Sequence, residues 1–288
     1  MTFSPLQLAA LTGIGGIIGY FSGLLGVGGG FMLTPLLIFL FRIPEQLAVG
    51  SGMAQMIAVG FGATRRHMAA GFVDFRLFGV SAPGVVAGTF AGKWILSWLV
   101  SLGAVSLIGQ QFQLARLVLS VLFLLMLGWI AVRFWGEAGQ EKSTSATGRL
   151  CWTCGPLLIA LPASGVSRVS LVALLACGLL IGVMAGLLGV GGGVVLIPLL
   201  VFGFGIPMRL AIGTSSAIVM LSAIVVTGQY ALIDAVSLPL VIALMLGSVL
   251  GVQIGAWHSH RLAVGHLHRV FAIVAIVVAC IVLFRLFG

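Results

Sequence analysis

The chain of 288 residues is 61% hydrophobic and only 7% charged, with a mean hydropathy of +1.28, so it has too little polar surface to cover a soluble globule. Its long runs are apolar on every face, which excludes a transmembrane barrel and predicts an all-α polytopic membrane protein. The net charge of +9 comes from basic residues scattered at the ends of these runs, a pattern that fits anionic lipid and argues against a nucleic-acid partner.

The first half predicts five helical segments, expected at residues 6–25, 31–41, 46–65, 75–98 and 114–134. The second of them has about eleven residues, or roughly 17 Å of helix, and cannot cross a hydrocarbon core of about 30 Å. We therefore expect a half-helix or one arm of a re-entrant pair at this point.

A polar stretch at residues 137–165 predicts a linker between a first transmembrane repeat, residues 1–136, and a second, residues 166–288. The linker holds Cys151 and Cys154 in a C-x-x-C spacing, with no second pair or nearby histidine to complete a metal site. An incidental pair and a redox or metal pair are both compatible with the sequence, and the incidental one is favoured.

The second half repeats the first at a constant offset of 163 residues, which indicates internal duplication, the plan of many secondary transporters. If the short segment is counted, each half has five segments and the repeats are inverted; if it is not, eight spans form parallel repeats. The inverted count places most basic residues on one side of the membrane, so the positive-inside rule favours it. Both termini are then expected outside, with the linker in the cytoplasm.

One eight-residue motif occurs twice, as Gly23 to Gly30 and as Gly186 to Gly193, and each copy ends in three glycines. Backbone without helical hydrogen bonds is costly in lipid, so each triplet must be buried in protein or line a wet cavity. The short helix that follows offers free N–H groups to an anion. Tight helix crossing is the alternative explanation. The candidate substrate-binding glycines are Gly28, Gly29, Gly30, Gly191, Gly192 and Gly193.

A second interruption is expected at residues 50–52 and, in the other half, at residues 213–216. Hydroxyls beside a glycine can donate to an oxyanion, or bond back to carbonyls one turn earlier. Because the pattern occurs in both halves, we add Ser51, Thr214, Ser215 and Ser216 to the candidate substrate-binding residues.

The remaining polar residues predict neither an enzyme nor a cofactor. The five acids lie near expected span ends, so no carboxylate pair is available at the midplane to carry a cation. Four histidines between His258 and His268 lack zinc-site spacing. Lys93 lies near the end of its span and is expected to extend towards the membrane interface.

The doubled motif G-L-L-G-V-G-G-G, followed by an apolar stretch with Pro and then I-P-x-x-x-A-[VI]-G-[ST], resembles the sulfite exporter TauE/SafE family. The family motifs fall on Gly26, Gly28 to Gly30, Pro35, Pro44 and Gly50-Ser51, and on Gly189, Gly191 to Gly193, Pro198, Pro207 and Gly213-Thr214.

The resemblance implies a multi-pass protein of the bacterial inner membrane that exports small sulfur-containing anions such as sulfite or sulfonates. An uptake permease for another small organic anion and a non-transport membrane scaffold are the alternatives. The expected partners are a small anionic substrate and the lipid bilayer, with a homo-oligomer as the alternative to a monomer.

Overall fold

The computed structural model describes residues 5–25, 29–107, 110–137, 158–161, 166–259, 261 and 264–287. The first half forms α1 (Pro5–Leu25), α2 (Gly30–Pro35), the π-helical turn η1 (Leu36–Leu40), α3 (Glu45–Ala69), α4 (Phe75–Ser101) and α5 (Leu114–Glu137). The second half forms α6 (Leu171–Leu188), α7 (Gly193–Pro198), the π-helical turn η3 (Leu199–Gly203), α8 (Met208–Ala231), α9 (Leu238–Ser259) and α10 (Val264–Phe287).

Six described helices, α1, α3, α4, α6, α8 and α9, are long and apolar enough to cross a membrane. Shorter apolar stretches lie in α5 and α10, at residues 117–129 and 272–284. The prediction of an all-α polytopic membrane protein is therefore confirmed.

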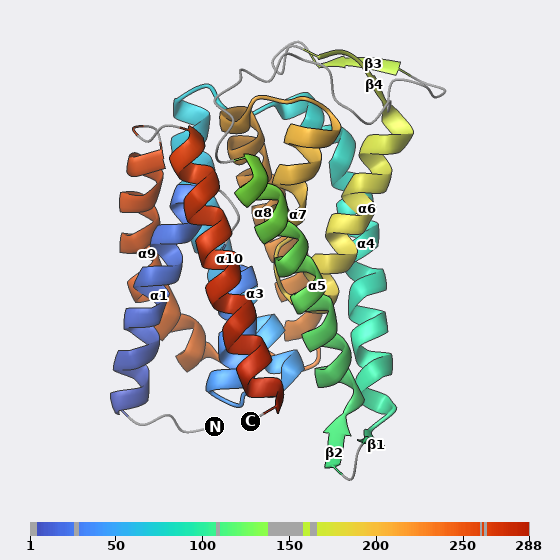
Figure 1. Ribbon diagram of the computed structural model, residues 1–288, viewed down its shortest axis with the longest axis vertical. Helices are drawn as coiled ribbons and strands as arrows, with labels where there is room; N and C mark the ends of the chain where they lie inside the picture. The colour runs from blue at the N-terminus through green and yellow to red at the C-terminus, as the bar shows by residue number, and fades with distance from the viewer. Residues whose placement is uncertain are drawn as a thin grey trace.

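Two short hairpins lie at opposite ends of the helix bundle (Figure 1). Strand β1 (Ala104–Leu107) pairs antiparallel with β2 (Gln110–Gln113), and β3 (Leu158–Leu161) pairs antiparallel with β4 (Val166–Ser170). The start of α1 and the end of α10 lie at the β1–β2 end, whereas the end of α5 and the start of α6 lie at the β3–β4 end. Most of the predicted linker lies outside the described residues, and so do both Cys151 and Cys154.

The sequence explains why α2 and α7 are short. Each begins after a glycine in the left-handed conformation and reaches a proline, Pro35 or Pro198, after which the chain widens into a π-helical turn. Proline removes one backbone donor, and a local π turn is one way in which a membrane helix satisfies the backbone groups that are freed. Residues 30–40 are too short to cross the membrane, as expected.

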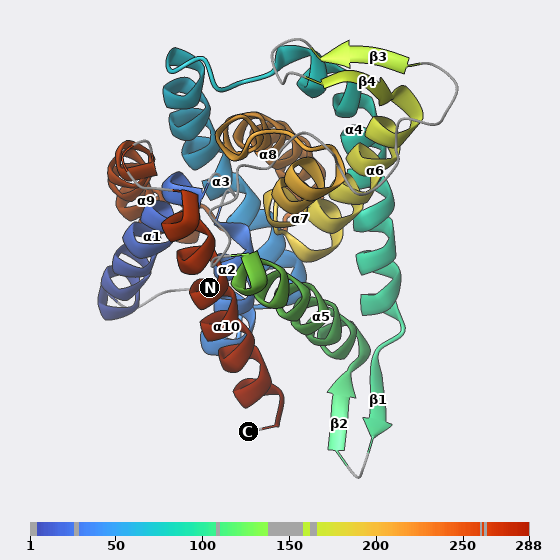
Figure 2. The same cartoon turned by 45° about the horizontal axis from the view of Figure 1, so that its top comes forward.

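The two halves are interwoven rather than side by side. Helix α1 packs along α9, α4 along α6, α3 along α8, and α5 along α10, so each of these pairs joins one half to the other. Figure 2 shows the α1–α9 and α4–α6 pairs on opposite flanks, with α3 and α8 between them. The principal core of the molecule is therefore made from both halves.

Glycines allow the two helices of a pair to pack very closely at two interfaces, which we call the α4–α6 seam and the α1–α9 seam. In the α4–α6 seam, a methyl group at Gly88 or Gly182 would collide with the backbone of the partner helix. In the α1–α9 seam, the same holds for Gly19 and Gly251. The colliding carbonyls also correspond at the offset of 163: Val85 faces Gly182 as Ser248 faces Gly19. Small residues allow such backbone contact in membranes, as expected for this glycine pattern.

Corresponding helices of the two halves run in opposite directions. In Figure 1, α1 runs from the β1–β2 end towards the β3–β4 end, whereas α6 runs the other way; α5 and α10 are opposed in the same manner.

The expected helix interruption at residues 50–52 and 213–216 is wrong. Helices α3 and α8 run without a break through these residues. The glycines serve close approach instead: a methyl group at Gly50 would collide with the carbonyl oxygen of Ala235, and one at Gly213 with that of Phe72.

Candidate functional site

The second glycine loop is described from end to end. Helix α6 ends at Leu188, and its C-cap residue Gly189 adopts φ +66° and donates its N–H to the Ala185 oxygen at 3.0 Å. Gly191 and Gly192 follow with φ of +71° and +77°, a region that a residue with a Cβ atom rarely adopts. The loop therefore depends on glycine at these positions, and every residue from Gly189 to Gly193 is buried.

The first loop is described from Gly29 onward, and Gly28 lies outside the described residues. Gly29 adopts φ +72°, and its carbonyl oxygen accepts from the N–H groups of Met32 and Leu33 at 3.1 and 3.0 Å. The Gly192 oxygen accepts from Val195 and Leu196 at 3.1 and 2.9 Å. The two short helices thus start in the same way.

The two glycine loops approach each other inside the protein. A methyl group at Gly30 would lie 2.5 Å from the carbonyl oxygen of Gly189, and the Thr34 hydroxyl donates to that same oxygen at 3.0 Å. Met56 of α3 fills the space beside both loops, since its Sδ would lie 2.7 Å from a methyl group at Gly30 and its Cε 2.5 Å from one at Gly191. We call this place the loop crossing.

The hydroxyls of Ser51 and Thr214 serve contacts between the halves. Ser51 Oγ accepts from the backbone N–H of Ser237, just before α9, and Thr214 Oγ1 accepts from that of Asp74, just before α4, both at 2.9 Å. Asp74 in turn caps α4 by accepting from Arg76 and Leu77 N–H groups. The expected open backbone beside these hydroxyls is absent because their helices are continuous.

Ser215 and Ser216 follow the alternative that the sequence left open. Both hydroxyls donate to the Ile212 carbonyl oxygen one turn earlier, at 2.9 and 3.0 Å.

Other polar residues escaped the sequence prediction. Ser22 of α1 and Gln55 of α3 are each 1% exposed, and Ser22 Cβ would lie 3.2 Å from a methyl group at Gly29. Ser222 of α8 donates to the Gly191 oxygen at 3.2 Å and to the Val219 oxygen at 2.9 Å. A comparison of the halves could have found them, since Ser22, Gln55 and Ser222 correspond to the apolar Ala185, Ile218 and Val59.

Lys93 reaches the end of a helix in the other half. Its ammonium donates to the Gln229 backbone oxygen at 2.7 Å, in the last turn of α8, and lies 5.8 Å from the centre of the Tyr230 ring. Tyr230 donates to the Gly186 oxygen at 2.9 Å, at the start of the second motif. A cation suits the negative end of a helix dipole, so Lys93 stabilises the end of α8.

Within the described ranges, no group of three or more His, Cys, Asp or Glu side chains could hold a metal. Of the histidine group, His258 lies beside Tyr20, with its Nδ1 3.2 Å from the phenolic oxygen, while His260 falls outside those ranges.

The sulfite exporter TauE/SafE family profile matches residues 11–282, nearly the whole chain and both loops. The chain belongs to the sulfite exporter TauE/SafE family.

Relatives of this TauE/SafE chain are membrane transporters by name. A "Probable membrane transporter protein" of Xylella fastidiosa is 27% identical over 282 residues, covering 97% of this chain and 96% of the relative. A protein of Haemophilus influenzae with the same name is 25% identical, covering 92% and 94%. "Probable membrane transporter protein YunE" of Bacillus subtilis is 22% identical, covering 96% and 97%. No solved structure matches the chain.

Membership of the TauE/SafE family assigns the chain to a transporter family rather than to an enzyme class. Its six apolar helices and its bacterial relatives support the expected multi-pass location in the bacterial inner membrane. A small-molecule substrate and a lipid environment follow from the same finding.

Proposed function

We propose that the chain is a secondary transporter that exports small sulfur-containing anions, such as sulfite, a sulfonate or a related oxyanion, across the inner membrane. The observation that carries the proposal is the loop crossing, where Gly30 and Gly189 from opposite halves meet inside the protein. Irregular backbone at membrane depth is tolerated only where it is buried or lines a cavity, and transporters commonly bind substrate at such helix interruptions. The glycines from Gly28 to Gly30 and from Gly191 to Gly193 are the proposed lining.

Two inverted repeats provide the proposed movement. Supporting this are the opposed courses of α1 and α6 and the contacts that recur at the offset of 163 residues. Rocking of one repeat against the other about a fixed central site is the usual form of alternating access in such folds. The loop crossing, which draws on both halves, would then be exposed to each side in turn.

The charge distribution supports an anion rather than a cation as cargo. The acids in the described ranges are Glu45, Asp74, Glu137 and Asp234, all at helix ends or in a turn. The side chains nearest to Gly29, Gly30 and Gly191 are those of Ile18, Ser22, Met56 and Val219, none of which carries a negative charge. A cation site in a membrane normally supplies carboxylates.

The test is flux into proteoliposomes of the purified chain, screened with sulfite, thiosulfate, sulfate, sulfonates and carboxylates. We expect saturable flux of a sulfur oxyanion that excess unlabelled sulfite competes away. Flux of carboxylates alone would mean that the substrate is another organic anion. If none of these anions is transported and none shifts the melting temperature, the result would support a scaffold instead. The direction of transport is measured with vesicles that hold the protein in a known orientation, with the anion supplied first inside and then outside.

A paired substitution locates the site. Gly30→Ala places a methyl group against the Gly189 oxygen, whereas Gly52→Ala meets nothing closer than 3.5 Å in the neighbouring α2. We expect Gly30→Ala to lose about tenfold or more in flux and Gly52→Ala to remain near wild type. If Gly30→Ala melts normally and transports normally, the loop crossing is not the site.

A further inference from the structure

Two buried polar side chains on helices that border the loop crossing each have an atom without a partner among the described residues. Ser22 Oγ and Gln55 Oε1 make no hydrogen bond within the described part of the chain, although both residues are only 1% exposed. Such an atom normally destabilises a fold, so its presence in the core calls for an explanation. Comparable atoms on Thr64, Thr227 and Gln229 lie near the ends of α3 and α8, away from the crossing.

Both residues lie on the first-half side of the crossing. Ser22 is adjacent to Gly29, with its Cβ 3.2 Å from the position of a methyl group there. Gln55 is next to Met56 in α3, and the Met56 sulfur lies beside Gly30. Gln55 also lies about one turn after Gly52, which faces Leu33 and Thr34 of α2.

The second half offers no matching pair. The residues that correspond to Ser22 and Gln55 are Ala185 and Ile218, both buried and apolar. Its nearby hydroxyl, that of Ser222, already donates within the protein. The unpartnered polarity is therefore confined to one side of the crossing, although the backbone around it is similar in both halves.

Among the described residues, the side chains that contact the two loops are uncharged. They are Ile18 and Ser22 of α1, Thr34 of α2, Val49 and Met56 of α3, Ile181 of α6, and Val219 and Ser222 of α8. Gln55, next to Met56 in α3, is uncharged as well. An anion held here would be stabilised by hydrogen bonds alone. Because the cost of desolvation rises with the square of an ion's charge, such a site penalises a dianion far more than a monoanion.

We propose that Ser22 and Gln55 recognise the substrate and select a monovalent oxyanion that still carries a proton, hydrogensulfite being the example among sulfur oxyanions. This inference rests on the function proposed above. Gln55 Oε1 is an acceptor and takes the ligand's O–H as its donor, while the Ser22 hydroxyl donates to an unprotonated ligand oxygen. A dianion offers no O–H, so it leaves Gln55 Oε1 unpaired.

In the wild-type protein, KM for sulfite transport is measured at two pH values, one unit below and one unit above the second pKa of sulfite. The hydrogensulfite fraction falls about tenfold across that interval, so KM for total sulfite should rise about tenfold while KM for hydrogensulfite stays constant. Methanesulfonate, a monoanion without an O–H, should compete at least about tenfold more weakly than hydrogensulfite. A KM that follows the dianion, or equal competition by methanesulfonate, would overturn the inference.

The variants exchange each polar residue for its counterpart in the other half. Gln55→Ile and Ser22→Ala should each raise KM for hydrogensulfite by about tenfold or more, and Gln55→Ile should also lose the preference over methanesulfonate. Both should melt at or above the wild-type temperature, because each removes an unpaired buried polar atom. Gln253→Ile, at an exposed position of α9, is the matched control and should leave KM unchanged.

The outcomes separate the two proposals. If the wild-type chain moves no sulfur oxyanion, the proposed function fails. If it does, and Gln55→Ile and Ser22→Ala keep wild-type KM and selectivity, the function stands and the assignment of Ser22 and Gln55 is wrong.

Discussion

Ser51 and Thr214 show how one hydroxyl can connect the two halves. Each lies in the second turn of a continuous helix and accepts from the N–H of a residue that precedes a helix of the opposite half, Ser237 for Ser51 and Asp74 for Thr214. Helix N-termini leave backbone donors without intrahelical partners, and in lipid each such group is expensive. The two bonds therefore fix where α9 and α4 begin relative to α3 and α8.

We predict that Thr214→Val and Ser51→Ala each destabilise the protein by about 1–3 kcal/mol, because each leaves a buried N–H unpaired. Thermal or denaturant unfolding in detergent measures the effect. Thr214→Ser keeps the acceptor and serves as the control, which should unfold like the wild type. A Thr214→Val protein of normal stability that no longer transports would instead assign the hydroxyl to the substrate.

At the residue scale, the sequence pointed to Ser51 and Thr214 but not to the contacts that they make. Ser51 and Thr214 were visible because they occur in both halves, but their partners lie 186 and 140 residues away along the chain and have no local signature. Ser22 and Gln55 were missed for the opposite reason. Each is polar in one half only, so a comparison that rewards matches between the halves passes over them.

At the scale of elements, glycine has two different uses in this chain. Gly192 gives the loop a backbone conformation with φ of +77°, whereas Gly182 lies within regular helix α6 and only allows α4 to come close. The sequence predicts the helices well because long runs that are apolar on every face favour membrane-spanning helices over any other structure. It wrongly predicted an interruption at residues 50–52. A glycine that interrupts a helix and a glycine that lets a neighbouring carbonyl pack closely cannot be told apart in the sequence.

Gly182→Ala and its counterpart Gly19→Ala should each destabilise the protein by about 1–3 kcal/mol, because the added methyl group meets backbone that cannot move aside. Gly79→Ala in α4 meets nothing within 4 Å and should be neutral or more stable by up to about 1 kcal/mol. Unfolding in detergent compares the three. Equal stability of Gly182→Ala and Gly79→Ala would contradict the close seam.

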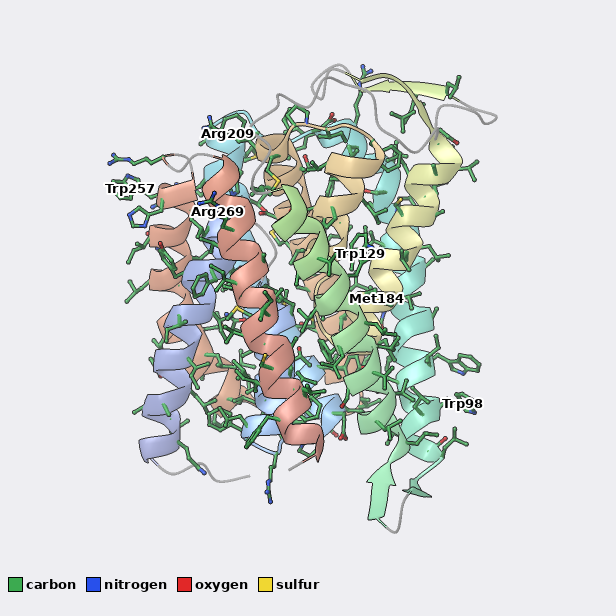
Figure 3. The ribbon with its side chains drawn as sticks, viewed as in Figure 1. Trp98, Trp129, Met184, Arg209, Trp257 and Arg269 are labelled. Carbon is green, nitrogen blue, oxygen red and sulfur yellow. The ribbon has the colours of Figure 1, made fainter. Side chains whose placement is uncertain are left out.

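At the scale of the whole molecule, the two ends differ in charge. Arg209 and Arg269 lie at the β3–β4 end (Figure 3), as do the helix ends that carry Arg65, Arg66 and Arg76. Trp98 lies towards the opposite end and points outward, as an interfacial aromatic residue does.

We predict that the β3–β4 end faces the cytoplasm and that both termini face outward, because loops rich in Lys and Arg are retained inside. Reporters at the N- and C-terminus, one active only outside and one only inside, measure this. Both ends should activate the external reporter, and a reporter inserted after Glu137 should be active only inside. Termini on different sides would exclude inverted repeats.

The interwoven halves impose an unequal order on synthesis. Helix α6 can settle on α4 as soon as it leaves the ribosome, since α4 is already in place. Helix α1 is made long before its partner: its glycine face, with Gly15, Gly19 and Gly23, fits α9, which follows α8 in the chain. Two helix interfaces that look alike in the finished protein thus form at different times, and the contact face of α1 stays without its partner until α9 has been made.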